Sequence, residues 1–333
     1  MADYSDLEKS INSGDVVVLD GAIGTELQAM GAPMDAASWA GLPNLTHPST
    51  VLQMHMNYIR AGADIITTNT YSSARHNLEP LGNAELTSEL NIRAVHLARE
   101  AISRVNPDRP IYVCGAVSNF GLLSGTEHNA QRRISRRRGG LLRRNAITDE
   151  QALDNLKEQA EILAMAGVDF MMAESTGSLI QRKWVSEACA AVGLPMWTGF
   201  KVHKDEGDPE IKIGYGGSES LSQALQEVIP MGGSVVTVFH SGVEETDESI
   251  SIVKDHWSGP IAAYPESGRR DYVDRFQDVT SENEMSPDGY LEMSKKWVSE
   301  GVQIIGGCCG MGVDYIEPLR DGLPAKISSP RTI

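Results

Sequence analysis

Cysteines are scarce in this sequence, which has only Cys114, Cys189, Cys308 and Cys309 in 333 residues. Four cysteines in a chain of this length do not make a disulfide framework, so a reduced, cytoplasmic setting is expected. The N-terminus has acidic residues early and lacks the apolar segment of a signal peptide, which agrees with that setting. No apolar run approaches the roughly 18 residues of a membrane span, so no membrane partner is expected.

Positive charge is also scarce, because 29 Lys and Arg stand against 45 Asp and Glu and the formal net charge is −16. Nucleic-acid binding needs a basic face for the phosphates, so nucleic acid is excluded as the main partner. No GxGxxG motif follows the first predicted strand, which weakens a dinucleotide-binding interpretation. Small molecules are the expected partners, and the oligomeric state stays open, a homo-oligomer included.

Apolar runs alternate with amphipathic stretches about eight times along the chain. The expected strands are Val16–Asp20, Asp64–Thr68, Ile111–Val117, Asp169–Glu174, Met196–Phe200, Ser234–Phe239, Pro260–Tyr264 and Val302–Gly306. The expected helices are Pro48–Ala61, Asn83–Val105, Thr148–Ala166, Leu179–Val192, Ser218–Pro230, Glu244–His256, Pro287–Glu300 and Asp314–Asp321.

The predicted strands are continuous apolar runs, as in a parallel sheet that is covered on both faces. Eight such βα units in this length predict a single-domain α/β protein, residues 1–333, with a (β/α)₈ TIM barrel. The alternative is an open, doubly wound sheet.

One segment departs from the acidic composition. Residues 128–148 form an atypical arginine-rich loop, in which HNAQRRISRRRGGLLRRNA (128–146) carries seven arginines and no acid. Blocks of like charge are usually solvated or disordered, which favours a mobile loop over the barrel mouth. A clamp for an anionic substrate, a partner-binding patch and an erroneous stretch of coding sequence are the alternatives.

The stretch from Val302 to Gly310, VQIIGGCCG, is the strongest chemical signal. Neighbouring residues on a strand point to opposite faces, so Cys308 and Cys309 serve one metal only if the chain bends, and the flanking glycines permit that. Thiolate pairs favour zinc and other soft metals. Two buried, inert cysteines are the alternative, but the position at the carboxyl end of a strand favours a metal site.

A barrel places its chemistry at the carboxyl ends of the strands. Those ends supply Asp20, Asn69, Tyr71, Ser118, Asn119, Glu174, Lys201, His240, Ser241, Tyr264, Cys308 and Cys309. Buried carboxylates at strand ends are uncommon without a partner, which favours a functional Glu174. Asp20 has a turn or capping role as its alternative, and Asn69 a structural hydrogen-bonding role. Cys114 and Cys189 are expected in the core.

Five motifs resemble the homocysteine S-methyltransferase family: DGAIGTEL (Asp20–Leu27), GADIITTNTY (Gly62–Tyr71), GVDFMMAES (Gly167–Ser175), YPESG (Tyr264–Gly268) and GGCCG (Gly306–Gly310). The resemblance covers roughly residues 14–322. It implies a homocysteine-binding barrel, a zinc ion held by three cysteines and methyl transfer to the sulfur of homocysteine, giving methionine. The implied donor is S-methylmethionine, betaine or another sulfonium or betaine-type compound.

The resemblance also implies roles for single residues. Cys308 and Cys309 match two zinc ligands, while Asp20 and Glu174 match carboxylates that receive the amino end of homocysteine. Asn69 belongs to the same expected substrate site. The residues that fall near positions contacting the methyl donor or shaping the cleft are Tyr71, Trp39 and Tyr264, for which core or rim packing is the alternative. No catalytic residue beyond the metal is implied.

The sequence departs from the family at the third cysteine. The sixth predicted strand reads SVVTVFHSG, which puts His240 where that cysteine should be, and a shift by one residue puts Ser241 there. Neutral imidazole is a good zinc ligand, so a Cys₂His site with His240 remains reasonable. A two-cysteine site completed by another group, and no zinc at all, are the alternatives.

Zinc coordination deprotonates a bound thiol, which at neutral pH is otherwise only slightly ionised. The leading hypothesis is therefore a zinc-dependent methyltransferase with homocysteine and a cationic donor as substrates. One alternative is a barrel of the same ancestry used for another metal-assisted reaction, and another is a non-catalytic ligand-binding protein.

Overall fold

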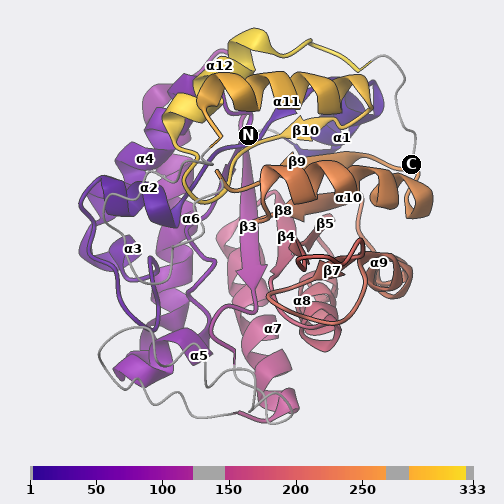
Figure 1. Ribbon diagram of the computed structural model, residues 1–333. Helices are drawn as coiled ribbons and strands as arrows, with labels where there is room; N and C mark the ends of the chain where they lie inside the picture. The colour runs from indigo at the N-terminus through magenta and orange to yellow at the C-terminus, as the bar shows by residue number, and fades with distance from the viewer. Residues whose placement is uncertain (1–2, 123–146, 268–284, 328–333) are drawn as a thin grey trace.

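A computed structural model describes residues 3–122, 147–267 and 285–327 of the chain. Within these ranges the chain forms one eight-stranded parallel sheet surrounded by helices (Figure 1). The strands are β1 (Val17–Val18), β2 (Ile65–Thr67), β3 (Tyr112–Ser118), β4 (Phe170–Ser175), β5 (Met196–Phe200), β8 (Val235–Phe239), β9 (Ile261–Tyr264) and β10 (Ile304–Ile305). Each lies in one of the eight predicted strand regions.

The sheet closes into a barrel. Its order is β1-β10-β9-β8-β5-β4-β3-β2, so β1 and β2 are the two ends of the ladder. An isolated parallel bridge between Leu19 and Ile65 joins those ends. Backbone hydrogen bonds from Asp20 to Ile65 (3.0 Å) and from Asp64 to Val18 (2.7 Å) support this seam. The predicted (β/α)₈ barrel is confirmed, and the open doubly wound sheet is wrong.

A helix follows each strand and packs outside the barrel, from α4 and α6 around to α11 and α12 (Figure 1). These helices are α4 (Pro48–Ala61), α6 (Thr87–Val105), α7 (Asp149–Ala166), α8 (Leu179–Ala191), α9 (Leu221–Val228), α10 (Val243–His256), α11 (Pro287–Ser299) and α12 (Val313–Gly322). All eight overlap the expected helices.

Glycines end several helices just before a strand. Gly62 ends α4 with a φ of 107°, and Gly167 ends α7 with a φ of 93°, in the left-handed region that favours glycine. The aspartate that follows Gly62 by two residues ties neighbouring strands together, because Asp64 Oδ2 accepts a hydrogen bond of 3.0 Å from the Val18 amide. The repeated glycine and aspartate therefore fix where the strands start.

Apolar side chains form two layers. The barrel interior contains large residues such as Leu19, Phe170 and Trp197, while a larger cluster fills the space between sheet and helices. A first helix, α1 (Tyr4–Asn12), packs against the interior cluster at the amino ends of the strands. Its Tyr4 hydroxyl bonds to Ser234 Oγ (2.8 Å) and accepts from Trp197 Nε1 (2.9 Å), so α1 closes this end of the barrel.

Short elements are inserted at the opposite rim, the mouth, where the carboxyl ends of the strands meet. The antiparallel hairpin β6 (Val202–Lys204) and β7 (Ile211–Ile213) follows β5 directly and was not expected from the sequence. The short helices α2 (Gly24–Ala29), α3 (Pro43–Thr46) and α5 (Arg75–Leu78) lie in the loops after β1 and β2. These insertions enlarge the mouth without changing the barrel.

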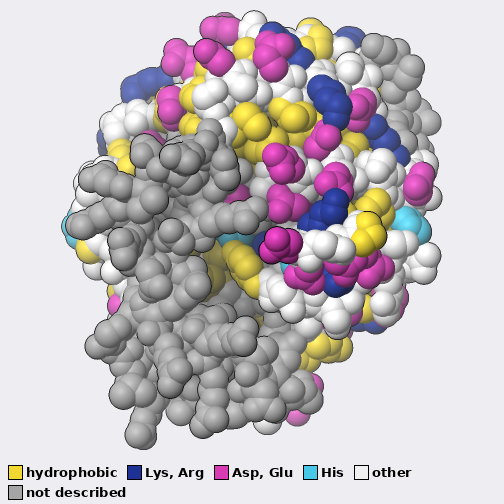
Figure 2. All heavy atoms as spheres, in the orientation of Figure 1, with side chains coloured by type: hydrophobic (Ala, Val, Ile, Leu, Met, Phe, Trp, Pro, Cys, Tyr) yellow, Lys and Arg dark blue, Asp and Glu magenta, His cyan; other side chains and the backbone are white. Residues whose placement is uncertain are grey.

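In Figure 2, hydrophobic and acidic side chains border the described side of a recess near the centre of the face. The predicted arginine-rich loop lies outside the described residues, apart from Ile147 and Thr148 at its end.

Among the helices that the structure describes, none is both long and apolar enough to cross a membrane.

Candidate functional site

Three predicted metal ligands meet at the mouth. The side-chain ligand atoms of His240, Cys308 and Cys309 all lie within 4.8 Å of one another. His240 Nδ1 is 3.3 Å from Cys308 Sγ. His240 follows β8 and the cysteines follow β10, so the barrel brings together residues that are far apart in the chain.

The glycines before the cysteines allow the chain to bend closely against the barrel. A Cβ on Gly306 would lie 2.7 Å from Leu19 Cβ and 2.9 Å from the Asp20 carbonyl oxygen. A Cβ on Gly307 would lie 2.6 Å from Met311 Cβ. The amides of Gly306 and Gly307 donate to the backbone of β9 and of Asp20 (3.1 and 3.0 Å). Only glycine fits this turn, which lets adjacent cysteines serve one site.

His240 adopts an unusual backbone conformation. Its φ is 47°, in the left-handed region, which costs a non-glycine residue roughly 1 kcal/mol. Its ring nitrogens contact different groups, because Nε2 bonds to the Tyr215 hydroxyl while Nδ1 faces Cys308. By contrast, Ser241 Oγ donates to the Phe239 carbonyl (2.8 Å) and accepts from the Val202 amide (2.9 Å). The structure therefore brings His240, not Ser241, to the cysteines.

The donor set fits a zinc ion. Tetrahedral zinc with Zn–S near 2.3 Å and Zn–N near 2.0 Å holds its ligand atoms roughly 3.5 Å apart. The 3.3 Å separation of Nδ1 and Sγ is close to that spacing. A hydrogen bond with Cys309, together with burial, raises the pKa of Cys308 well above its usual range. A metal would therefore be the group that ionises this thiol, and three protein ligands leave a fourth position for a substrate.

Two buried carboxylates lie at the same rim. Asp20 accepts hydrogen bonds from the Thr67 amide (2.6 Å) and hydroxyl (2.9 Å), and Glu174 accepts one from the Tyr264 hydroxyl (2.9 Å). Burial raises the pKa of Asp20 to about 7, with repulsion from Glu174 adding to the rise. Burial also raises the pKa of Glu174 to about 7. Because both charged forms lack full solvation, an incoming ammonium group would be strongly favoured here.

Aromatic rings line another part of the mouth. Trp39, Tyr71 and Phe120 pack around one another with centroids 6.3, 6.0 and 5.6 Å apart. Burial raises the pKa of Tyr71, and Glu174, Cys308 and Cys309 are close enough to add to that rise. The Tyr71 ring therefore lies on the side of this aromatic group that faces Glu174 and the two cysteines. Tyr264 lies deeper, stacked on Phe239 (5.5 Å) beneath Glu174.

Asn69 has a different environment. Its amide donates to the Ala40 carbonyl (2.7 Å) and to Asn44 Oδ1 (3.0 Å), and its own carbonyl accepts from Asn44 Nδ2 (2.8 Å). These bonds fasten the loop after β1 to the end of β2. They favour the structural alternative for Asn69, which holds the backbone around the mouth in place and is not shown to face the site. Cys114 and Cys189 are buried in the core, as expected.

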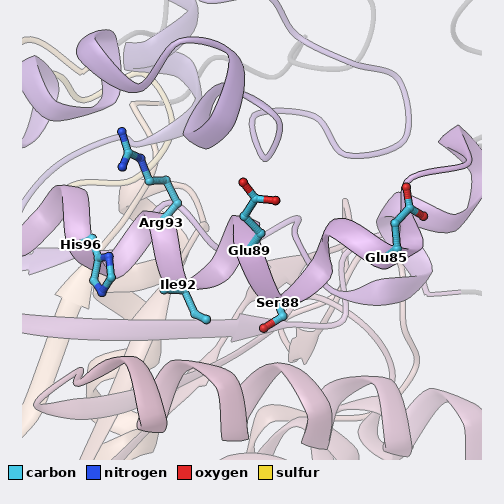
Figure 3. Close-up of a pocket in the computed structure, with 6 residues that line it drawn as sticks. All are labelled: Glu85, Ser88, Glu89, Ile92, Arg93 and His96. Atoms are coloured by element: carbon cyan, nitrogen blue, oxygen red, sulfur yellow. The ribbon is translucent and has the colours of Figure 1, made fainter.

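A separate shallow pocket of about 530 Å³ lies along the outside of α6 (Figure 3). Its described lining is a single stripe at helical spacing: Glu85, Ser88, Glu89, Ile92, Arg93 and His96. None of these is a predicted site residue, and the mixed charges offer no converging chemistry. We therefore assign the functional site to the barrel mouth.

Residues 17–323 match the family model described as Homocysteine S-methyltransferase. The chain belongs to the homocysteine S-methyltransferase family. It is 25% identical to the selenocysteine methyltransferase of Astragalus bisulcatus, with 91% of each chain covered. It is 26% identical to homocysteine S-methyltransferase 4 of Zea mays, with 89% of this chain and 86% of the relative covered.

The family fold is also seen in solved structures. The metallated form of the homocysteine methyltransferase MmuM from Escherichia coli superposes with a TM-score of 0.71 at 19% identity. The match covers 95% of this chain and 99% of that protein. At this identity the similarity supports the (β/α)₈ barrel alone.

In this member of the homocysteine S-methyltransferase family, sequence reasoning missed several residues at the mouth. Tyr215 comes from the unexpected β6–β7 insertion, and its sequence context gave no signal. Glu266 lies 3.6 Å from His240 Nδ1 and stands within the YPESG motif. Phe120 follows Ser118 and Asn119 at the end of β3, which is the signal that could have revealed it.

Proposed function

We propose that this chain is a zinc-dependent methyltransferase that moves a methyl group from a sulfonium or betaine-type donor to the thiol of homocysteine, giving methionine. The observation that carries this proposal is the cluster of His240, Cys308 and Cys309 beside two buried carboxylates at the barrel mouth. None of the four cysteines, all of which lie in the described residues, forms a disulfide, which agrees with a reducing, cytoplasmic setting. The whole chain would act as one barrel domain on small molecules.

In this proposal Cys308, Cys309 and His240 hold the metal. Bound zinc would keep the homocysteine sulfur as a thiolate beside the donor methyl group. Asp20 and Glu174 bind the ammonium group of homocysteine, which fixes the direction of its side chain. Fixed orientation of two reactants lowers the entropic part of the barrier.

The donor occupies the aromatic part of the mouth. Trp39, Tyr71 and Phe120 present ring faces and edges that suit a cationic onium group through cation–π attraction. The acceptor sulfur forms a bond to the methyl carbon while the bond from that carbon to the donor sulfur or nitrogen breaks. The bonding pair goes to the donor atom, which leaves neutral, and the thiol proton is lost to solvent.

The test is metal content and methyl transfer for wild type, Cys308→Ala and His240→Ala. We expect about one zinc per wild-type chain, methionine formation with at least one onium donor, and loss of both properties in the two variants. Cys189→Ala is the matched control, because Cys189 is a buried free cysteine on α8. Wild-type protein that contains no zinc and transfers a methyl group from no donor would refute the proposal.

A selenol acceptor is the second candidate, because some relatives carry the name selenocysteine methyltransferase. Replacing a thiolate ligand by His240 removes one negative charge from the ligand set, which makes a bound thiolate less nucleophilic. A selenol is more acidic than a thiol and depends less on activation by the metal. Competition between homocysteine and selenocysteine for one donor would separate the two acceptors.

A further inference from the structure

Tyr215 lies beside the candidate metal cluster, on the segment that follows the β6–β7 hairpin. Its hydroxyl hydrogen-bonds to His240 Nε2, and its ring meets the imidazole edge-on, with centroids 5.8 Å apart and an interplanar angle of 83°. On the other side of the imidazole, Nδ1 is 3.3 Å from Cys308 Sγ. The two nitrogens of the His240 ring therefore contact different groups, Nε2 the tyrosine and Nδ1 the cysteine.

The position of the Tyr215 ring is closely defined although the side chain is 64% exposed. Gly214 precedes it in the left-handed region (φ 76°), and the Gly214 amide donates to the Lys201 carbonyl (2.9 Å). The Lys201 ammonium lies over the Tyr215 ring, 4.6 Å from its centroid. Contacts with a cation and with an imidazole, rather than burial in the core, therefore fix the position of this exposed ring.

A neutral imidazole carries one proton, on either Nδ1 or Nε2, and only the other nitrogen can bind a metal. Glu266 Oε2 lies 3.6 Å from Nδ1, so a small shift would let this carboxylate accept a proton on Nδ1. That tautomer would turn an N–H toward Cys308 and block coordination. An oxygen that accepts from Nε2 selects the opposite tautomer, with the Nδ1 lone pair directed at the cysteines.

We propose that Tyr215 is a positioning residue for the metal centre, whose hydroxyl accepts the Nε2 proton of His240 and thereby offers Nδ1 to a soft divalent metal held with Cys308 and Cys309. This inference rests on the proposed function, because it needs a metal at the cluster. It also accounts for the strained backbone of His240, since a left-handed residue is retained where its surroundings fix the side chain.

The test uses the full chain with zinc and with cadmium-113. Tyr215→Phe keeps the ring under Lys201 and removes only the hydroxyl. Tyr112→Phe makes the same atomic change in a buried tyrosine at the amino end of β3 and serves as the control. Zinc affinity is measured by competition with a chelator. Nitrogen-15 NMR of histidine-labelled, cadmium-loaded protein identifies the metal-bound nitrogen, and His240→Ala assigns its signal among the eight histidines.

In wild type we expect cadmium coupling to Nδ1 of His240. In Tyr215→Phe we expect zinc affinity about 10- to 100-fold lower and a mixture of tautomers, whereas Tyr112→Phe behaves as wild type. Wild-type coupling through Nε2, a result that needs no variant, would overturn the inference. So would a Tyr215→Phe protein that binds zinc as tightly as wild type through the same nitrogen.

Failure of the proposed function has a different signature. Wild type that binds metal through Nδ1 but transfers no methyl group refutes the proposed reaction and leaves the role of Tyr215 intact. Wild type that binds no metal at all refutes both.

Discussion

Glu174 shows how much a single residue can be inferred from its place in the sequence. Its position at the end of a predicted buried strand indicated a functional carboxylate, and the structure places it at the mouth, bonded to Tyr264. The partner was not predictable, because Tyr264 comes from another strand 90 residues away. Side-chain type and strand position are local properties, whereas hydrogen-bond partners depend on register across the barrel.

Glu174→Gln should weaken binding of homocysteine while keeping the bond from Tyr264, because an amide oxygen still accepts it. Losing a charged partner for the ammonium should raise KM for homocysteine about 10- to 100-fold, with a smaller change in KM for the donor. Steady-state kinetics with each substrate varied in turn measure this. Glu161→Gln, an exposed change on α7, is the control. An unchanged KM for homocysteine would remove Glu174 from the binding site.

His55 makes a separate residue-scale prediction about acid stability. It is fully buried on α4, and neither ring nitrogen has a hydrogen-bond partner among the described residues. Burial lowers its pKa to about 4 from an ordinary 6.5. The unfolded chain therefore takes up this proton first as the pH falls. The free energy of unfolding should drop by about 3 kcal/mol between pH 6.5 and pH 4 on account of His55.

The measurement is urea unfolding of wild type and His55→Leu across that pH range. The difference between the two proteins isolates His55 from Asp20 and Glu174, whose raised pKa values act in the opposite direction. We expect the variant to lose the acid sensitivity, and exposed His47→Leu to keep it. Parallel pH profiles for wild type and His55→Leu would contradict the prediction.

At the scale of elements, the strands and the main helices were predictable because each carries its own signal. Continuous apolar runs predicted the eight strands, and glycines that follow the helices predicted several of the helix ends. The β6–β7 hairpin was missed because its short strands, Val202–Lys204 and Ile211–Ile213, are separated by a charged stretch that resembles a loop. Helix α1 does carry a signal, with Asp3 as its cap and Tyr4, Leu7 and Ile11 on one face, but nothing local shows where it packs.

The turn between β10 and α12 gives the prediction at this scale. Gly306→Ala should push the turn away from Leu19 and the Asp20 carbonyl, because the new Cβ would lie within 3 Å of both. We expect a loss of about 1–3 kcal/mol in the free energy of unfolding, together with reduced zinc content. Chemical unfolding and metal analysis measure the two effects.

Gly289→Ala on α11 is the matched control, because the nearest neighbours of its new Cβ are side-chain atoms rather than backbone, Met285 Sδ at 3.0 Å and Ser286 Oγ at 3.2 Å. It should bind zinc as wild type does. A Gly306→Ala protein with full zinc content and unchanged stability would show that the close packing of this turn does not matter.

At the scale of the molecule, the barrel divides stability from chemistry. α1 and the large interior side chains close the end at the strand amino termini, while the polar residues and cysteines gather at the mouth. This division was predictable from the fold class. The detailed shape of the mouth was not, because it depends on inserted loops such as the one that carries Tyr215.

The wall of the barrel is not equally strong all the way round. β3 and β4 pair over five residues, but β1 and β2 meet at one bridge, and the Asp20 carboxylate reinforces that junction through its two bonds to Thr67. Asp20, which we propose as a ligand for the substrate ammonium group, therefore also stabilises the weakest junction of the barrel wall. A bound cation that keeps this carboxylate ionised should therefore raise the free energy of unfolding of the barrel, so that substrate binding and folding are thermodynamically linked.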